Sequence, residues 1–162
     1  MKFLFSKISL VVYLLVSFSP AWAQARTPEE LITQVLKAVE AKDAASLKAL
    51  SISDDEVKRL VWPPAIIGNG VTADSFTSTF QRSSAAGLNT VLSEYGGKKL
   101  QLTKVEMPKP SKQSNGAKVY PAPKIAVKDE SGQEKSAALI GGVLEQGGTY
   151  RVSTYYVAPT TR

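Results

Sequence analysis

The stretch ALIGGVLEQGGTYRVSTYYV, Ala138–Val157, decides the fold because it contains two strand patterns joined by a tight turn. The segment SAALIGGVLE (136–145) is apolar on both faces, which is typical of a central strand. The segment TYRVSTYYV (149–157) is rich in the β-branched and aromatic residues that favour strands. Gly147 and Gly148 lie between them, where a tight hairpin turn requires positive φ angles. The end of the chain is therefore predicted to form two adjacent antiparallel strands.

A second glycine pair, Gly141 and Gly142, lies inside the first of these strands. Glycines in a strand interior indicate a bulge, a strong bend or a place where a ligand or another backbone approaches closely. A phosphate-binding loop would need a helix directly after the glycines, and no helix pattern follows either pair. We therefore expect both pairs to shape the sheet rather than to bind phosphate.

Two further strands are expected upstream of this hairpin, over residues 100–107 and 119–128. Pro121 and Pro123 confine the start of the second one to an edge or a bulge, because proline cannot donate to a strand ladder. With the hairpin, these segments predict four antiparallel strands.

Helix signals dominate the first half of the chain. Thr27 is a suitable cap, Pro28 suits the first helical position, and Glu30 completes a capping box. A short helix is expected after Asp43. Another is expected to start at a capping box of Ser53 and Glu56, and it ends before a pair of prolines.

The longest predicted helix begins at the cap Thr72 and ends at Gly96. Gly87 inside it either weakens the helix or allows close packing on the sheet. The predicted fold class is α+β, with N-terminal helices over about 28–95 packed on a curved four-stranded antiparallel sheet over about 98–157.

The N-terminus has the layout of a cleaved secretory signal. Lys2 and Lys7 are basic, Ile8–Phe18 is an apolar run interrupted by two serines, and Pro20 breaks it. The run is far shorter than the approximately 20 residues of a membrane span. Ala21 and Ala23 then place small residues at the positions that signal peptidase reads.

We expect cleavage after Ala23, with a cut after Ala25 as the alternative and an uncleaved anchor as the other. Residues 1–23 are then the signal peptide, and residues 24–162 form a single α+β domain. The mature protein is expected in the periplasm or secreted, with no stable membrane anchor after cleavage. It contains no cysteine, so it must fold without disulfides.

The composition excludes several kinds of chemistry. The chain has no histidine and no cysteine, which removes Ser-His-Asp and Cys-His nucleophilic sites and ordinary zinc sites. It contains no Walker loop and no dinucleotide fingerprint. The acidic run Asp54, Asp55 and Glu56 falls in the first turn of a helix, where acids complement the dipole. We therefore expect no metal and no cofactor.

The net charge is +6, and lysines are dense in the second half of the chain. Such a density attracts an anionic partner or, more commonly, forms a solvated sheet face. No basic motif interleaved with aromatic residues is present, so nucleic acid is not an expected partner. The lysines are Lys98, Lys99, Lys104, Lys109, Lys112, Lys118, Lys124, Lys128 and Lys135.

The opening PEELITQVLKAVEAKDAASLKAL (28–50), followed by another helix and a long meander, resembles the nuclear-transport-factor-two-like superfamily. Its wider class is the cystatin-like α+β fold. The order of elements departs from that pattern between Trp62 and Thr72, where short strands are usual. The resemblance implies a cone, in which a curved sheet wraps a long helix around an apolar pocket. Members include isomerases, dehydratases, polyketide cyclases and many proteins without catalysis, so fold settles little about function.

Candidate ligand-binding residues surround the expected long helix. The aromatic ones have a core role as the alternative, because large apolar side chains are usually buried. By strand alternation, Tyr150, Val152, Thr154 and Tyr156 would share one face. Arg82 is a candidate partner for an acid group or faces solvent. The candidates are Trp62, Phe76, Phe80, Arg82, Tyr150 and Tyr156.

Acid–base chemistry in a dry pocket is the catalytic route that the composition leaves open. Isomerases of the superfamily that this chain resembles use an Asp base with a Tyr and a protonated Asp. The residues available for such roles are Asp74, Glu94, Glu106, Tyr120, Tyr150, Tyr155 and Tyr156. None lies in a recognisable motif, and we assign no catalytic residue.

The sequence therefore predicts a non-catalytic exported module that binds a small apolar ligand or a protein partner. The first alternative is a metal-free pocket enzyme with isomerase or dehydratase-like chemistry. The second is a structural subunit that forms a homodimer through the sheet. A buried carboxylate opposite a tyrosine hydroxyl would favour the enzyme, and a pocket filled by its own aromatics would favour the structural subunit.

Overall fold

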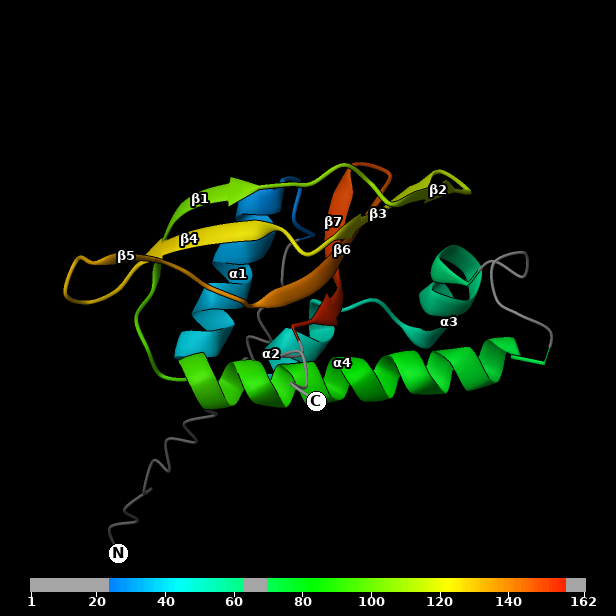
Figure 1. Ribbon diagram of the computed structural model, residues 1–162, viewed down its shortest axis with the longest axis horizontal. Coiled ribbons are helices and arrows are strands. Elements are labelled where there is room, and N and C mark those ends of the chain that lie inside the picture. The colour runs from blue at the N-terminus through cyan, green and yellow to red at the C-terminus, as the bar shows by residue number, and fades with distance from the viewer. Residues whose placement is uncertain (1–23, 63–69, 157–162) are drawn as a thin grey trace, which may run out of the picture.

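The computed structural model describes residues 24–62 and 70–156, which form an α+β structure as predicted. The helices precede the strands (Figure 1). The predicted signal peptide, most of the segment between Trp62 and Thr72, and Val157 lie outside the described residues. No helix among the described residues combines the length and apolar character needed to cross a membrane. The helices are α1 (Pro28–Glu40), α2 (Ala44–Ala49), α3 (Asp54–Glu56), the π-helical turn η1 (Val57–Val61) and α4 (Ala73–Tyr95).

The helix caps predicted from sequence are confirmed. The Thr27 hydroxyl accepts from the Glu30 N–H at 3.1 Å, although the Glu30 carboxylate accepts from the Arg26 N–H rather than from the cap residue. Ser53 and Glu56 form a reciprocal capping box at the start of α3. The other two predicted caps also accept from the first turn of their helices; they are Asp43 for α2 and Thr72 for α4.

The described strands form two antiparallel sheets instead of the single four-stranded sheet that was predicted. One sheet has the order β1-β4-β5 and the other β2-β3-β6-β7. The predicted strands 119–128 and 136–145 are each divided between the sheets: Pro123 separates β3 from β4, and 137–139 separates β5 from β6. The strands are β1 (Gln101–Glu106), β2 (Lys112–Ser114), β3 (Ala117–Pro121), β4 (Lys124–Lys128), β5 (Glu134–Ser136), β6 (Ile140–Gln146) and β7 (Thr149–Tyr155).

The two glycine pairs have different structural roles, as the sequence predicted. Gly147 and Gly148 have φ angles of 58° and 73° and form the turn between β6 and β7. Gly142 lies where the register between these strands shifts. A Cβ atom on Gly142 would lie 2.5 Å from the Ser153 hydroxyl oxygen, so a side chain there has no room.

This irregular pairing overturns the predicted alternation along β7. Gly142 pairs with Thr154 and Val143 pairs with Val152, so Ser153 is an extra residue on β7. A bulge of this kind shifts the following side chains to the opposite face. As a result Tyr155, rather than Tyr156, is the deeply buried tyrosine at 1% exposure.

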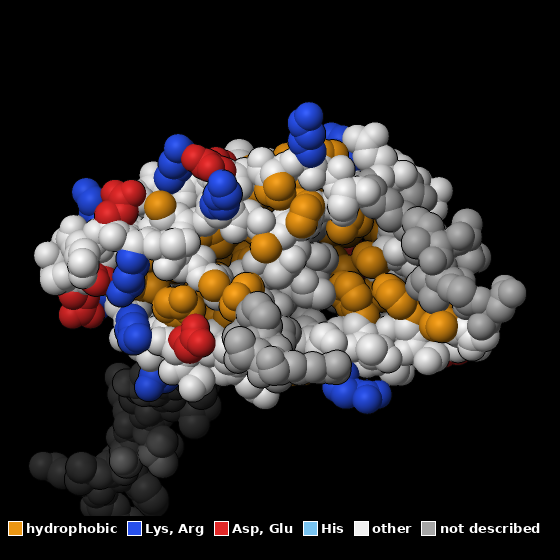
Figure 2. Space-filling model, in the orientation of Figure 1, with side chains coloured by type: hydrophobic (Ala, Val, Ile, Leu, Met, Phe, Trp, Pro, Cys, Tyr) orange, Lys and Arg blue, Asp and Glu red, His pale blue; other side chains and the backbone are white. Residues whose placement is uncertain are grey.

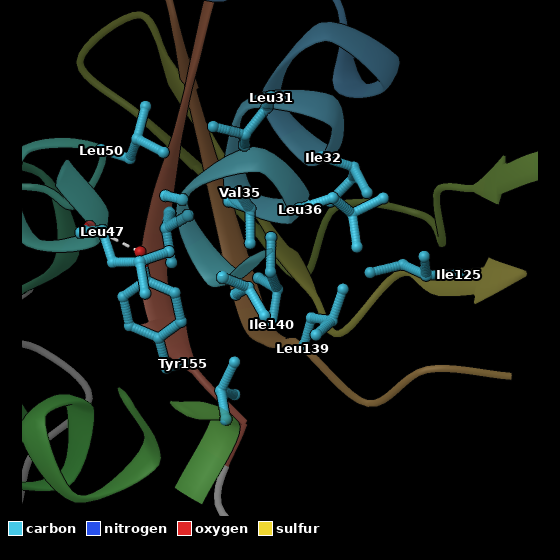
Figure 3. Close-up of a cluster of buried hydrophobic side chains, with 14 of the residues drawn as sticks. Leu31, Ile32, Val35, Leu36, Leu47, Leu50, Ile125, Leu139, Ile140 and Tyr155 are labelled. Carbon is cyan, nitrogen blue, oxygen red and sulfur yellow. Dashed lines mark hydrogen bonds between the residues drawn. The ribbon is translucent and has the colours of Figure 1, made fainter. Parts of the chain in front are cut away.

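The main core lies between α1 and the strands. Figure 3 shows Leu31, Val35 and Leu36 of α1 in one cluster with Ile140 of β6 and with Leu139, which directly precedes β6. These side chains are almost fully buried, as expected for the apolar stripe of a surface helix. A second, smaller cluster is formed by Ile52, Val57, Leu60, Ala117 and Leu144.

Helix α4 runs along one long side of the molecule and packs on β7 (Figure 1). Its buried residues are mostly small. At Gly87 the helix lies very close to the backbone of β7, because a Cβ atom there would lie 2.6 Å from the Tyr155 carbonyl oxygen. Gly87 therefore allows close packing on the sheet, one of the two predicted roles. Figure 2 shows hydrophobic side chains gathered between α4 and the strands above it.

Candidate binding groove

A groove of about 590 Å³ lies between α4, residues 44–54 and β7. This volume falls within the range of small-molecule sites, about 300–1,000 Å³. Its apolar lining includes Ile52, Leu88 and Tyr155, and its charged lining consists of Lys48, Asp54 and Arg151. The other lining residues are Ala44, Ala49, Ser51, Ser53, Gln81, Ser84, Ala85 and Asn89. We call this feature the α4 groove.

Helices α2 and α4 form two walls of the groove, and each contributes small residues together with larger ones. From α4 it receives Gln81, Ser84, Ala85, Leu88 and Asn89, whose spacing of three and four residues places them on one helix face. Alanines of α2 form the opposite wall.

Arg151 of β7 is held in a fixed orientation beside the groove. Its Nη1 lies 2.7 and 2.6 Å from the two carboxylate oxygens of Glu56, and its Nη2 donates to the Ser51 carbonyl. Guanidinium has five N–H donors, and these contacts occupy three of them. No described residue accepts from the other two, and the side chain lines the groove with one-third of its surface exposed (33%).

Glu56 is a permanently charged partner for this arginine. Burial raises the pKa of the Glu56 carboxyl, but hydrogen bonds from the Ser53 N–H and hydroxyl and the nearby Arg151 outweigh it. The net effect is a pKa below the usual value. Glu56 does not line the groove, so the ion pair presents its positive member to the ligand space.

Tyr155 lies at the base of the groove with its hydroxyl already engaged. The hydroxyl donates to the Leu47 carbonyl at 2.5 Å (Figure 3). Burial raises the pKa of this phenol well above its usual value, so it stays neutral. Tyr155 is therefore not available as an acid, and at 1% exposure it belongs mainly to the core.

None of the six residues predicted to bind ligand lines the α4 groove. Three of them are brought together at the start of α4: the rings of Trp62 and Phe76 lie 5.2 Å apart, and those of Phe76 and Phe80 lie 5.8 Å apart. Phe76 and Phe80 pack against the smaller core cluster. This row is a half-buried extension of the core.

The other three predicted residues are dispersed. Arg82 is exposed, and Tyr150 packs against the main core beside Ala25. Tyr156 lines a separate hollow of about 320 Å³ with Ser83, Ala122, Gly141, Thr154 and Tyr155. Sequence reasoning missed Arg151 and Lys48, although the small-residue run SSAAG (83–87) inside the longest helix is a signal for a groove.

The carboxylates considered for catalysis lie outside the groove. Asp74 is paired with Lys58, and Glu106 is paired with Lys104, each at 2.6 Å. Both acids are exposed, and hydrogen bonds from these lysines lower both pKa values. Glu94 is also exposed on α4.

The one tyrosine–carboxylate pair on the sheet joins Tyr120 to Glu145 at 2.6 Å. The hydrogen bond to Glu145 and burial raise the pKa of Tyr120 to about 12. The same hydrogen bond and Lys118, whose Nζ lies 3.1 Å from Glu145, keep the pKa of Glu145 low despite burial. Neither group is poised to exchange a proton near neutral pH.

One further ion pair lies at the end of the molecule that carries β4 and β5. Lys135 lies 3.2 Å from Asp129, and Figure 2 shows basic and acidic side chains side by side there. The run Asp54, Asp55 and Glu56 forms the first turn of α3, as predicted. Among residues 24–62 and 70–156, no group of three acidic, histidine or cysteine side chains could hold a metal ion.

Comparisons with protein-family models, with curated proteins and with solved structures found no match. Function must therefore be inferred from the groove itself.

Proposed function

We propose that this chain is an exported, non-catalytic binding module that holds a small amphipathic ligand in the α4 groove. The observation that carries the proposal is the groove of about 590 Å³ with the fixed guanidinium of Arg151 in its wall. Ligand sites are typically concave and mostly apolar, with a few polar groups that fix orientation. Leu88 and Ala85 supply the accessible apolar part here, and the lining residues Ile52 and Tyr155 are 3% and 1% exposed.

The electrostatics favour binding over catalysis. An isomerase or dehydratase-like enzyme, the alternative function, would need a carboxylate with a raised pKa facing a hydroxyl in a dry pocket. The carboxylate that lines the groove, Asp54, is exposed, and the Tyr155 hydroxyl is bonded to Leu47. Glu145, the carboxylate that does face a tyrosine, has a lowered pKa.

We also propose that the two sheets form the curved surface of the nuclear-transport-factor-two-like fold. Two chain segments, 117–128 and 134–146, pass from one sheet into the other, which supports a single bent surface. The position of α4 along β7 is consistent with a long helix against such a sheet. The groove then differs from the expected cone pocket, because α2 forms one of its walls.

Export is part of the same proposal. A secretory signal over residues 1–23 would deliver the chain to the periplasm or the medium, where it would meet its ligand. The other alternative is a structural subunit that forms a homodimer through the sheet. The experiment below detects such a dimer by its mass.

The test is native mass spectrometry of the mature protein purified gently from the periplasm of its native host. Ala85 is exposed and lines the groove, so Ala85→Trp fills it without disturbing the core. Ala86 is equally exposed but does not line it, which makes Ala86→Trp the matched control. We expect a bound non-protein mass on the wild type and on Ala86→Trp, and its loss on Ala85→Trp.

A wild-type protein without added mass would contradict ligand binding. A clean dimer would then favour the structural homodimer, and a clean monomer would favour capture of a protein partner. An added mass that survives Ala85→Trp would place the ligand outside the α4 groove.

A further inference from the structure

We infer that the ligand of the α4 groove carries one carboxylate, bound by Arg151 and Lys48, on an apolar chain that lies along Ile52, Ala85 and Leu88. This inference rests on the proposed binding function and deepens it by naming the ligand class. Three features of the groove carry it: the orientation of the guanidinium, the balance of charge in the lining and the position of the apolar walls.

The guanidinium is preorganised for an oxygen acceptor. Glu56 and the Ser51 carbonyl fix its plane, and the Nε–H and one Nη2–H have no described acceptor. A guanidinium edge with two donors matches the two oxygens of a carboxylate. Because the side chain is already ordered, little additional conformational entropy is lost when a ligand binds.

The charges that line the groove favour a single negative charge. Arg151 and Lys48 are its two cations, and Asp54 is its one acid. Glu56 neutralises the positive charge of Arg151. Lys48 forms no ion pair with any described residue, so it supplies the positive charge that remains available to a ligand. The charged lining residues, two cations and one acid, sum to +1, which one carboxylate neutralises and a dianion exceeds. A monocarboxylate completes an alternating sequence of charges from Glu56 to Lys48.

The apolar walls define what is attached to the carboxylate. Ile52 comes from the segment that follows α2, whereas Ala85 and Leu88 come from one face of α4. Tyr155 is only 1% exposed, so the accessible apolar surface comes mainly from Ala85 and Leu88. An alkyl chain buried there contributes about 0.8 kcal/mol per CH₂. The groove therefore suits a carboxylate on a linear or compact apolar body better than a small hydrophilic acid.

The experiment is calorimetric titration of the mature chain with decanoate and, as its uncharged match, decan-1-ol, both below their aggregation concentrations. We expect decanoate to bind about tenfold more tightly than decan-1-ol, as one charge-assisted contact predicts. Lys48 is exposed, so Lys48→Glu should fold and should weaken decanoate binding about tenfold while leaving decan-1-ol unchanged. Arg151→Gln should have the larger effect. Arg82→Gln, an exposed arginine outside the groove, is the control.

The variants separate the two levels of the proposal. If Ala85→Trp blocks both probes while Lys48→Glu and Arg151→Gln bind decanoate as tightly as the wild type, the groove stands and the carboxylate assignment is overturned. Equal wild-type affinity for both probes, or no wild-type binding of decanoate, overturns the carboxylate assignment as well. The binding function is tested separately by native mass spectrometry, where a bound non-protein mass on the wild-type protein supports it and its absence contradicts it. Arg151→Gln also removes the partner of Glu56, so Lys48→Glu decides the outcome if Arg151→Gln does not fold.

Discussion

Tyr155 joins the core, helix α2 and the groove through one side chain. Its ring belongs to the main core, its hydroxyl donates to the Leu47 carbonyl, and its side chain lines the groove. We predict that Tyr155→Phe lowers the free energy of unfolding by about 1 kcal/mol, because a buried hydrogen bond is lost while the ring is kept. Urea denaturation followed by circular dichroism measures this change.

Alkaline pH distinguishes the hydroxyl of Tyr155 from its ring. Burial raises the pKa of Tyr155 in the folded protein above the unfolded value of about 10. The stability that the neutral Tyr155 phenol contributes is fully present below pH 10. Above pH 10 the free energy of unfolding falls by up to about 1.4 kcal/mol per pH unit, because only the unfolded chain releases the phenolic proton. Tyr155→Phe should reduce this loss. Tyr156→Phe, on the neighbouring half-buried residue, is the control and should change stability by less than about 0.5 kcal/mol. The opposite ranking would contradict the assigned burial.

Helix α4 illustrates an element whose packing opposes its intrinsic preference. Replacing glycine with alanine inside a helix normally stabilises it by about 1 kcal/mol. At Gly87 the added Cβ would lie 2.6 Å from the carbonyl oxygen of Tyr155, and a backbone atom cannot move aside cheaply. We predict that Gly87→Ala destabilises the protein by about 1–3 kcal/mol, measured by thermal or urea unfolding. Ala86→Gly on the exposed face is the control and should cost only the propensity difference. A higher melting temperature for Gly87→Ala would contradict the close contact.

The elements predictable from sequence are those whose signals are local. The caps Thr27, Asp43 and Thr72 act within one turn of their own helix, and Gly147 and Gly148 act within one hairpin, so the residues themselves carry the information. The division into two sheets depends on pairing between distant segments. The extra residue Ser153 moves the side chains that follow it in β7 to the opposite face of the sheet. No pattern within β7 itself indicates this bulge.

The candidate groove was hidden from the sequence for the same reason. Its key arginine, Arg151, is fixed by Glu56, which lies 95 residues earlier in the chain. Its walls combine small residues with polar and charged ones, whereas the residues predicted to bind ligand were mostly large aromatic side chains such as Trp62 and Phe80.

The first residues of the expected mature chain form a backbone bridge with the last strand, β7. Ala25 is 3% exposed, and its carbonyl accepts from the Tyr150 N–H at 2.8 Å in an antiparallel bridge. This contact joins the beginning of the domain to β7, which also carries Arg151 and Tyr155. The two predicted signal-peptidase sites therefore differ in consequence: a cut after Ala23 keeps the bridge, and a cut after Ala25 removes it.

We predict that the exported protein begins at Gln24 and that this start stabilises the fold. The intact mass of protein from the periplasm should correspond to residues 24–162. A chain that begins at Arg26 should unfold with about 1–2 kcal/mol less free energy than one that begins at Gln24, because it loses one backbone hydrogen bond and a buried alanine. Ala25→Ser in the longer chain is the control, since it keeps the backbone bridge and changes only the small side chain. An exported chain that starts at Arg26, or equal stability of the two chains, would show that the bridge to Tyr150 contributes nothing to the mature protein.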